Sequence, residues 1–528
     1  MTSNYIIIFI VAILPLAYKY SFWLYVIQLK EYRLDRFKDY IFTPQWKSAL
    51  FNFWFFIEFP LFLFATTIIF NKSFEALIYP VLFYFLVIQN IFVIWKIFRK
   101  KILKPKITPR LAITLLILLL WIGFDFTWIL LQNHHSIIST YIIWLLLFSP
   151  AIVFICIWFS LPLVLYLKRG RMNQASNKTR DNKNTTIIWI TGSYGKSSIK
   201  EYLSSILEQE WKTLKTPENQ NTEMWVSNLI LRKLNETYKY FVVEMWAYKK
   251  WEIKTLGNIA NHKYWILTAV WTQHIWIFWN IENTKVGKAE IAKSVEKNKW
   301  VLYINWENSN IRSIKFSENL QSVRYGNFKW SDVTYSIKSS TQTQTSFSIT
   351  YKNHTYDFTT NLVWEHNILN ISWVIALALD LWVTKENLTK YLKNLSKPKN
   401  TLEIIKIPKY TLINDSYNLP ESGALAAIEV LCTLKWSKVL VMDDIFELWM
   451  KSKEIHINLW EKIARSGKVD KVLYIWENFK RFFIGWLIKW WFKNENILEE
   501  ISDIKIWSAI LFEWRSSKKY LDKIMENV

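Results

Sequence analysis

Long apolar stretches with almost no charge dominate the first third of the chain. They lie at about residues 4–18, 49–70, 76–98, 111–132 and 138–167. Most of them are long enough to cross a bilayer core of about 30 Å as helices. The first stretch is short and contains Pro15, but it lacks the basic leader and the small-residue cleavage site of a signal peptide. The pattern predicts a membrane domain of about five helices over residues 1–170.

Basic residues separate these stretches in a regular alternation. Residues 19–47, 99–110 and 168–186 each contain six Lys or Arg, whereas the turns at 71–75 and 133–137 hold one between them. Cytoplasmic loops carry an excess of Lys and Arg. The alternation therefore predicts an N-terminus outside the cell and a cytoplasmic location for everything after residue 170.

Two acidic residues, Glu58 and Asp125, fall within the apolar stretches. Carboxylates at membrane depth are costly unless they are paired or face a polar cavity, so a transport role is an alternative for this region. Neither residue belongs to a recognisable relay. Residues 171–184, which follow the last stretch, are polar, basic and without periodicity, and this pattern predicts a linker.

The soluble part begins with a predicted strand, a glycine-containing turn and a helix. The β-branched run TTIIWI (185–190) precedes TGSYGKSS (191–198), and apolar positions at helical spacing follow. This is the architecture of a phosphate cradle, in which backbone N–H groups and a lysine approach the phosphates and a hydroxyl serves Mg²⁺. The spacing is Gly-x-x-Gly-Lys-Ser, without the earlier glycine of the longer P-loop form. The candidate nucleotide-binding residues are Gly192, Ser193, Tyr194, Gly195, Lys196, Ser197 and Ser198.

The remaining pattern divides the soluble part into two α/β domains. Residues 310–360 alternate polar and apolar positions, which predicts hairpin strands attached to the central domain. From about residue 398, a second alternation of strands and helices predicts a C-terminal Rossmann-like domain. We therefore expect an α-helical membrane bundle, then a P-loop central domain over 185–397 and a C-terminal domain over 398–528.

Composition narrows the protein class and raises one anomaly. A chain of 528 residues with 52% hydrophobic and 21% charged residues is not disordered, and two cysteines exclude a disulfide scaffold or a four-cysteine zinc module. There are 10 glycines against 32 tryptophans, whereas about 7% glycine is usual. We hypothesise that many tryptophans stand where a recoded UGA codon specifies glycine. The alternative is an interface protein rich in tryptophan.

Five further segments follow the phosphate loop in order: TPENQNT (216–222), FVVEMWAYKKWEI (241–253), ILTAVWTQHIWIFWNIENTKVGKAEI (266–291), YINWEN (303–308) and WEHNILNIS (364–372). Together they resemble the Mur ligases, and the resemblance covers roughly residues 185–528. It implies an ATP-dependent ligase (EC 6.3.2) of peptidoglycan biosynthesis that activates a carboxylate as an acyl phosphate. The branch that it resembles most implies that the amine is a dipeptide such as D-Ala-D-Ala.

The resemblance also bears on the tryptophans, because several of them fall on family glycines. These are Trp189, Trp225, Trp246, Trp251, Trp271, Trp279, Trp364, Trp382 and Trp449. Such positions are turns and close approaches where φ is often positive, and a tryptophan there costs on the order of 1 to 3 kcal/mol. The positions therefore favour the recoding hypothesis.

The resemblance implies two Mg²⁺ ions in addition to ATP. Ser197 and Glu244 would hold the first ion, and His274 and Lys288 would hold the second. A lysine ammonium repels Mg²⁺, but the family commonly carries a carbamylated lysine at the position of Lys288, and a carbamate offers oxygen donors. The nearby Lys285 is the second choice for that role. The predicted catalytic residues are Lys196, Lys288 and Asp415.

Other site residues follow from the same resemblance. Asn305 is similar to the family asparagine that contacts adenine. His366, Asn367 and Asn370 match the family segment HN-x-x-N, although N-capping of the following helix explains them equally well. The predicted substrate contacts are Asn219, Asn221, Thr222, Asn418 and Arg515. Matching C-terminal segments carry Glu447, His456 and Ser516.

Departures from the family pattern leave the substrates open. Thr401 stands where an arginine is usual, and Asp443 replaces a glycine. Membrane helices replace the family's uridine-nucleotide domain, so the precursor is either nucleotide-linked or lipid-linked. The apolar stretches and the narrow basic clusters between them predict a multi-pass membrane protein with cytoplasmic catalytic domains and no nucleic-acid partner. The resemblance to a family of cell-wall synthesis implies that the membrane is the bacterial cytoplasmic membrane. The alternatives are a ligase of the folylpolyglutamate type and a non-catalytic membrane nucleotide sensor.

Overall fold

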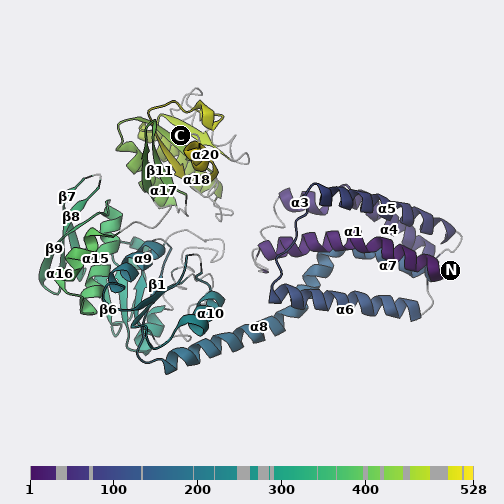
Figure 1. Cartoon of the computed structure of the whole chain (residues 1–528), viewed down its shortest axis with the longest axis horizontal. Helices are drawn as coiled ribbons and strands as arrows, with labels where there is room; N and C mark the ends of the chain where they lie inside the picture. Colours follow the sequence, from purple (N-terminus) through teal and green to yellow (C-terminus); the bar gives the residue numbers. More distant parts are fainter. Residues whose placement is uncertain are drawn as a thin grey trace. The chain divides into compact units, whose positions relative to one another are not determined.

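The fold is seen in a computed structural model of the whole chain (Figure 1). The structure describes residues 2–30, 32, 44–70, 75–131, 135–193, 195–218, 220–245, 262–270, 285, 291–341, 343–363, 365–395, 402–416, 421–443, 452–475, 497–513 and 517–526. The chain divides into two compact units, Met1–Gly170 and Arg171–Val528.

Helices build the described part of the first unit. They are α1 (Thr2–Leu29), α3 (Pro44–Leu50), α4 (Phe55–Phe70), α5 (Glu75–Phe98), α6 (Pro109–Leu131), α7 (His135–Leu147) and the beginning of α8 (Ser149–Asp181). Within the described residues, four helical segments are long and apolar enough to cross a membrane, judged by length and composition: Ile6–Leu29, Leu77–Phe98, Pro109–Ile129 and Ser149–Asp181. The first of them extends well beyond the predicted span over 4–18.

The last predicted span, 138–167, is broken after Leu147. Pro150 lies at the break and has no N–H to donate to the carbonyl of residue 146. The carbonyl oxygen of Leu146 instead accepts hydrogen bonds from Lys19 Nζ at 3.2 Å and from Ser149 Oγ at 3.0 Å. One expected helix is therefore two.

The predicted linker over 171–184 is wrong in its conformation, because α8 continues to Asp181. Met172 and Ala175 are buried in the core of the second unit, at a spacing that places them on one helix face. Lys178 Nζ donates to the carbonyl oxygen of Leu231 at 2.8 Å. Apart from Met172, the buried side chains of this segment are small or polar, such as Ala175, Ser176 and Thr179, so a hydrophobic periodicity does not mark it.

Both acidic residues of the apolar stretches have partners. The carboxylate of Glu58 pairs with Lys19 Nζ at 2.5 Å and accepts from Gln89 Nε2 at 3.0 Å. Asp125 accepts a hydrogen bond from the hydroxyl of Tyr141 at 3.3 Å. Pairing explains how these carboxylates are accommodated without an ion pathway.

A nine-stranded sheet with the order β2-β3-β1-β4-β5-β6-β7-β8-β9 forms the centre of the second unit. Its strands are β1 (Thr186–Thr191), β2 (Thr213–Lys215), β3 (Tyr240–Glu244), β4 (His262–Leu267), β5 (Val301–Asn305), β6 (Ser322–Tyr325), β7 (Val333–Ser340), β8 (Thr345–Tyr351) and β9 (His354–Thr360). Strands β2 to β7 pair in parallel, and β7 to β9 form antiparallel hairpins, which confirms the hairpins predicted within 310–360.

Both faces of this sheet are covered. Ile188 and Ile190 of β1 pack on α9 (Lys196–Leu207) and α15 (Glu365–Asp380), whereas Ile187 and Trp189 face the cluster that includes α10 (Glu223–Lys233). Two short helices, α14 (Ser309–Arg312) and α16 (Lys385–Lys393), complete the domain. Because strands buried on both faces have no polar side, TTIIWI reads as a continuous apolar run.

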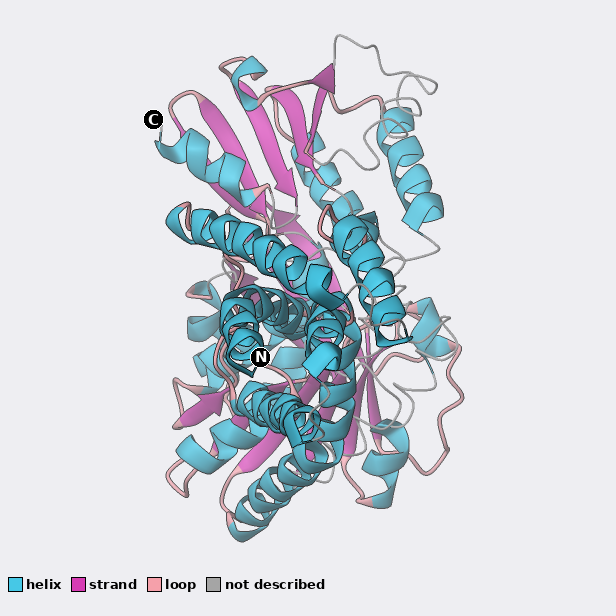
Figure 2. Cartoon of the chain, turned by 90° about the vertical axis from the view of Figure 1, so that its right-hand side faces the viewer, coloured by secondary structure: helices cyan, strands magenta, loops and turns pink. Residues whose placement is uncertain are grey.

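The C-terminal sheet has the order β10-β11-β15-β12-β13-β14, and its strands lie near the end marked C in Figure 2. They are β10 (Glu403–Ile407), β11 (Tyr410–Asp415), β12 (Ser437–Met442), β13 (Lys471–Tyr474), β14 (Ile497–Leu498) and β15 (Ser508–Glu513). All pairs are parallel except β10 with β11. Helices α17 (Glu421–Cys432), α18 (Ser452–Ser466) and α20 (Lys518–Glu526), with the short 3-10 helix η4 (Ile501–Asp503), accompany it. The expected α/β class is confirmed.

Three tryptophans adopt a backbone conformation that favours glycine. Trp330, Trp382 and Trp507 have φ of 67°, 72° and 65°. Trp382 is one of the tryptophans that fall on family glycines. Its side chain is 88% exposed, so packing does not compensate the backbone strain. By contrast, Trp189 is buried and stacks on Trp265 with ring centroids 5.6 Å apart.

Of the other suspected tryptophans, Trp225 lies in α10, half exposed. The positions Trp246, Trp251, Trp271, Trp279, Trp364 and Trp449 lie outside the described residues. The recoding hypothesis stays a prediction, supported by the three positive φ angles.

Candidate active site

The phosphate loop follows β1 at the carboxyl edge of the parallel sheet, between β3 and β4. Gly192 has φ of 147°, and a Cβ atom there would overlap Thr268 Oγ1 and lie 2.9 Å from the backbone nitrogen of Ala269. Ser193 N–H donates to the carbonyl oxygen of Ala269 at 2.8 Å. The loop is therefore held against the end of β4, at a separation that only glycine permits at residue 192.

Helix α9 begins directly after the loop. Gly195 precedes it with φ of 81°, a left-handed conformation that turns the chain into the helix. Lys196 Nζ donates to the carbonyl oxygen of Gly192 at 2.8 Å, so the lysine folds back over the loop. Burial lowers the pKa of the Lys196 ammonium, and the charge of Glu244 opposes this shift. The first N–H groups of an α-helix have no partner within the helix, and together with the positive dipole end at the start of α9 they favour an anion there.

Glu244, the last residue of β3, lies beside the start of α9. Its side chain is almost fully buried, and its two carboxylate oxygens accept from Ser197 Oγ at 3.0 and 2.9 Å. Asn221 Nδ2 lies 3.4 Å from Glu244 Oε1. The register that pairs Ile190 with Glu244 brings these residues together, since both strands end at the same sheet edge.

Two residues of this cluster were not predicted. Lys200 is buried one turn after Lys196, and its Nζ lies 3.5 Å from Glu244 and 3.3 Å from Glu201. Thr216 Oγ1 accepts the backbone N–H of Glu244 at 3.0 Å. The spacing of four residues between Lys196 and Lys200 places both on one helix face, a signal that the sequence does contain.

The hydroxyl of Ser197 and the carboxylate of Glu244 are a pair of hard oxygen donors, which are the ligands that Mg²⁺ prefers. They lie within hydrogen-bond distance of each other at the start of α9, where phosphate oxygens would complete the coordination. The residues present therefore fit a magnesium ion bound together with a nucleotide. Lys200 supplies the counter-charge that a buried carboxylate needs in the absence of the metal.

Asn305, at the end of β5, already uses both ends of its amide. Its Nδ2 donates to the carbonyl oxygen of Thr268 at 2.7 Å, and its Oδ1 accepts the N–H of Glu307 at 3.0 Å. The side chain joins β5 to the strand end behind Gly192. Its predicted contact with adenine stays a prediction and would use the remaining amide hydrogen.

The N-capping alternative for the HN-x-x-N segment is wrong, because Asn367 and Asn370 lie inside α15. Asn367 Oδ1 accepts the hydroxyl of Tyr202 at 3.1 Å, which fastens α15 to α9. The side chain of Asn370 faces Gly195, since a Cβ on that glycine would lie 3.2 Å from Asn370 Oδ1. These two asparagines of α15 thus pack against α9 and against Gly195 of the phosphate loop.

Asp415 and Glu513 end neighbouring parallel strands of the C-terminal sheet and are register partners. Leu402 N–H donates to Asp415 Oδ1 at 3.2 Å, whereas neither carboxylate oxygen of Glu513 has a hydrogen-bond partner among the described residues. Burial raises the pKa of Asp415 to about 7. Burial, and then the charge of Asp415, raises the pKa of Glu513 well above its ordinary value. Two buried carboxyl groups therefore lie side by side, and burial disfavours the charged form of each.

The remaining predicted site residues have few described contacts or lie outside the described residues. Thr222 caps α10 without a side-chain hydrogen bond, and His456 is buried in α18 with its ring 5.5 Å from that of Trp460. Lys285 is described only as a single helical residue. The predicted site residues Tyr194, Asn219, His274, Lys288, Asn418, Glu447, Arg515 and Ser516 lie outside the described residues, as does Thr401.

Comparisons with known proteins agree with this geometry. Residues 190–378 match the model of the Mur ligase middle domain. The UDP-N-acetylmuramoyl-tripeptide--D-alanyl-D-alanine ligase of Buchnera aphidicola subsp. Baizongia pistaciae is 30% identical over 358 residues, which are 66% of this chain and 76% of that protein. The ligase of the same name from Escherichia coli K12 is 27% identical over 299 residues, or 55% of this chain and 64% of the relative.

Solved structures share the fold. The structure of MurF from Acinetobacter baumannii superposes with a TM-score of 0.59 at 22% identity and covers 68% of this chain and 80% of that one. MurF ligase from Thermotoga maritima, solved in complex with ADP, has a TM-score of 0.57 at 20% identity and covers 68% of this chain and 82% of its own. The middle-domain match and the coverage of the Buchnera relative show that this chain belongs to the Mur ligase family of ATP-dependent ligases.

Proposed function

We propose that this protein joins a dipeptide, D-Ala-D-Ala, to the carboxylate of a UDP-MurNAc-tripeptide-type peptidoglycan precursor, with conversion of ATP to ADP and phosphate. The observation that carries the proposal is the cluster of Lys196, Ser197 and Glu244 at the end of the parallel sheet. The names of the relatives supply the substrates. The chain spans 64% of the Escherichia coli relative, so the substrates belong to the proposal.

The reaction needs two steps. A carboxylate oxygen attacks the γ-phosphorus of ATP, and the bond from that phosphorus to the bridging oxygen breaks. ADP departs, and the carboxylate has become an acyl phosphate. The amine of the dipeptide then attacks the acyl carbon, loses a proton, and inorganic phosphate leaves. Both transition states spread negative charge over phosphoryl oxygens, so the protein contributes positioning and electrostatic stabilisation more than covalent chemistry.

The described residues are suited to that task. Lys196 and the backbone N–H groups at the start of α9 would hold the phosphate oxygens, and Gly192 lets the loop approach them closely. Bound Mg²⁺ would neutralise charge on the transferring group, and Ser197 with Glu244 would hold it. His274 and Lys288 stay proposed ligands of a second ion, with carbamylation of Lys288 part of that proposal. Asp415 stays a proposed catalytic residue.

A membrane location is part of the proposal. Among the described residues, four apolar helical segments that begin in the first unit support it, together with the basic clusters that flank them. The positive-inside rule then places the ligase domains in the cytoplasm, where ATP is available. The precursor is nucleotide-linked by analogy with the relatives' names, and a lipid-linked precursor stays the alternative.

The test is amide formation in step with ADP release. Full-length protein in detergent is supplied with ATP, Mg²⁺, D-Ala-D-Ala and UDP-MurNAc-tripeptide, and both products are quantified by mass spectrometry. We expect one ADP per new amide, and loss of activity in Glu244→Gln with full activity in the control Glu208→Gln, a half-exposed carboxylate at the other end of α9. ATP turnover that is indifferent to the dipeptide would contradict the proposal.

A further inference from the structure

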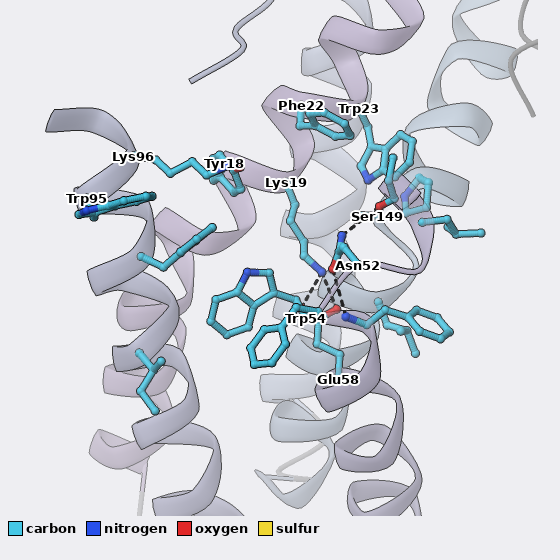
Figure 3. Close-up of a pocket in the computed structure, with 18 of the residues that line it drawn as sticks. Tyr18, Lys19, Phe22, Trp23, Asn52, Trp54, Glu58, Trp95, Lys96 and Ser149 are labelled. Atoms are coloured by element: carbon cyan, nitrogen blue, oxygen red, sulfur yellow. Dashed lines mark hydrogen bonds and ion pairs between the residues drawn. The ribbon is translucent and has the colours of Figure 1, made fainter. Parts of the chain in front are cut away.

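The first unit contains a cavity of about 810 Å³ between α1, α4 and α5 (Figure 3). We call it the polar cavity because Lys19, Asn52, Glu58, Lys96 and Ser149 are among the residues that line it. Aromatic and aliphatic side chains, such as those of Trp54 and Ile91, form most of the remaining wall. All of its residues belong to Met1–Gly170, and the ligase reaction described above uses none of them.

A second cavity, of about 560 Å³, adjoins the first. It shares Leu50, Phe55, Leu147 and Pro150 with the polar cavity. Every other residue that lines it is apolar: Trp46, Phe59, Phe148, Ala151, Phe154 and Ile155. We call it the apolar cavity. Polar side chains line the larger cavity and are missing from the lining of the smaller one, and this combination matches an amphiphile, not a small polar solute.

The charges of the polar cavity leave one cation uncompensated. Lys19 and Glu58 form an ion pair, seen as dashed lines in Figure 3, and Gln89 adds a hydrogen bond to the carboxylate, so this cluster is neutral. Lys96 has no carboxylate partner among the described residues. Its Nζ instead lies 5.1 Å from the ring centroid of Phe92 and 5.8 Å from that of Tyr18. The charged residues that line the polar cavity, Lys19, Glu58 and Lys96, thus carry a net charge of one positive unit.

The position of Lys96 suits an anionic head group. It lies in the last turn of α5, and Arg99, Lys100 and Lys101 follow directly. Basic residues at the cytoplasmic end of an apolar helix attract anionic lipids. The faces of the two aromatic rings attract the Lys96 ammonium and hold it at the cavity wall.

We propose that the two cavities bind one anionic phospholipid, with its phosphate at Lys96 and an acyl chain in the apolar cavity. A single phosphodiester carries one negative charge and matches the single uncompensated cation. A lipid-linked diphosphate carries more charge than the cavity offers to neutralise. A zwitterionic lipid has the same phosphodiester, but Lys96 repels its quaternary ammonium, so it gains less from Lys96 than an anionic lipid does. The inference goes beyond the ligase function and is independent of it.

The experiment titrates full-length protein in detergent with phosphatidylglycerol or phosphatidylcholine and counts bound lipid by native mass spectrometry. We expect one phosphatidylglycerol to bind at least fivefold more tightly than phosphatidylcholine, as one lysine near an anionic lipid is worth about 1 kcal/mol. Lys96→Gln should abolish this preference, and Lys96→Arg should keep it. The control is Lys183→Gln, which removes an exposed charge from the second unit and should keep the preference.

A second variant tests whether the acyl chain of the lipid binds in the apolar cavity. Ala151→Phe fills the apolar cavity without changing charge, and it should weaken binding of phosphatidylglycerol and phosphatidylcholine alike. Helical circular dichroism and the melting temperature Tm verify that each variant folds. Equal affinity for both lipids in the unchanged protein, or an unchanged preference in folded Lys96→Gln, would overturn the proposal. So would displacement of phosphatidylglycerol by equimolar isoprenyl diphosphate, which would identify a lipid-linked diphosphate as the occupant.

Discussion

Replacement of Gly192 by alanine tests whether the phosphate loop depends on a close backbone approach. The added Cβ would overlap Thr268 Oγ1 and crowd the backbone nitrogen of Ala269 at 2.9 Å, in a residue whose φ is 147°. The unfavourable backbone conformation costs about 1 to 3 kcal/mol, and overpacking costs about 1 to 3 kcal/mol more. The chain can avoid these costs only by moving the loop away from β4.

Movement of the loop would break two contacts that hold it in place. These are the hydrogen bond from Ser193 N–H to Ala269 and the one from Lys196 Nζ to the carbonyl oxygen of Gly192. If only about 2 kcal/mol of the penalty is transmitted to nucleotide binding, the affinity falls by about 30-fold. Isothermal titration of full-length protein with ADP and Mg²⁺ measures this change, and the Tm without nucleotide reports folding.

Two comparisons sharpen the result. Gly170→Ala adds a methyl group inside α8 with no atom within 4 Å, so ADP affinity should stay unchanged. In the double variant Gly192→Ala with Thr268→Ala, the overlap with the hydroxyl disappears while the crowding of Ala269 N remains. Affinity should then recover only in part. A folded Gly192→Ala protein that binds ADP within twofold of the unchanged chain would refute the reasoning.

Three further predictions concern residues outside this loop. Trp382→Gly should raise Tm by relieving a positive φ, worth about 1 kcal/mol, whereas Trp382→Ala retains Cβ and should gain little; equal gains would contradict the strain argument. Because the pKa of Asp415 is raised to about 7, the folded state binds more protons than the unfolded state between about pH 4 and 7, so stability falls as pH rises through this window. Asp415→Asn should flatten the decline of Tm between pH 5 and 7.5, and an unaltered slope would argue against a buried titrating carboxyl. Lys200→Met should lower Tm without ligand, because it leaves Glu244 with less counter-charge, and should enlarge the Tm increase produced by ADP and Mg²⁺; a smaller increase would show that Lys200 helps to bind the nucleotide.

Local sequence was sufficient for features that depend on neighbouring residues in the chain. The β-branched run, two glycines and Lys196 predicted a strand, a phosphate loop and a helix, and the structure shows this order at β1 and α9. Apolar length predicted helices in the first unit, and alternation predicted the hairpins of β7 to β9. Each of these follows from backbone geometry over a few residues.

Local patterns failed where a distant partner decided the conformation. Residues 171–181 have no apolar periodicity, yet they are helical because Met172 and Ala175 pack into the second unit. Asn367 has the sequence context of an N-cap, but its partner is the hydroxyl of Tyr202 on another helix. Side-chain contacts between separate elements outweigh weak local preferences.

Sequence by itself determined which chemistry the chain carries: a phosphate loop, a carboxylate after the next apolar strand, and apolar helices before both. Tertiary structure alone decided which groups meet. Strand pairing brings Glu244 to Ser197, the packing of α9 on β3 adds Lys200 to the same carboxylate, and register sets Asp415 beside Glu513. Charges far apart in the chain acquire their partners only when the sheets form, because hydrogen bonds and ion pairs act over a few ångströms.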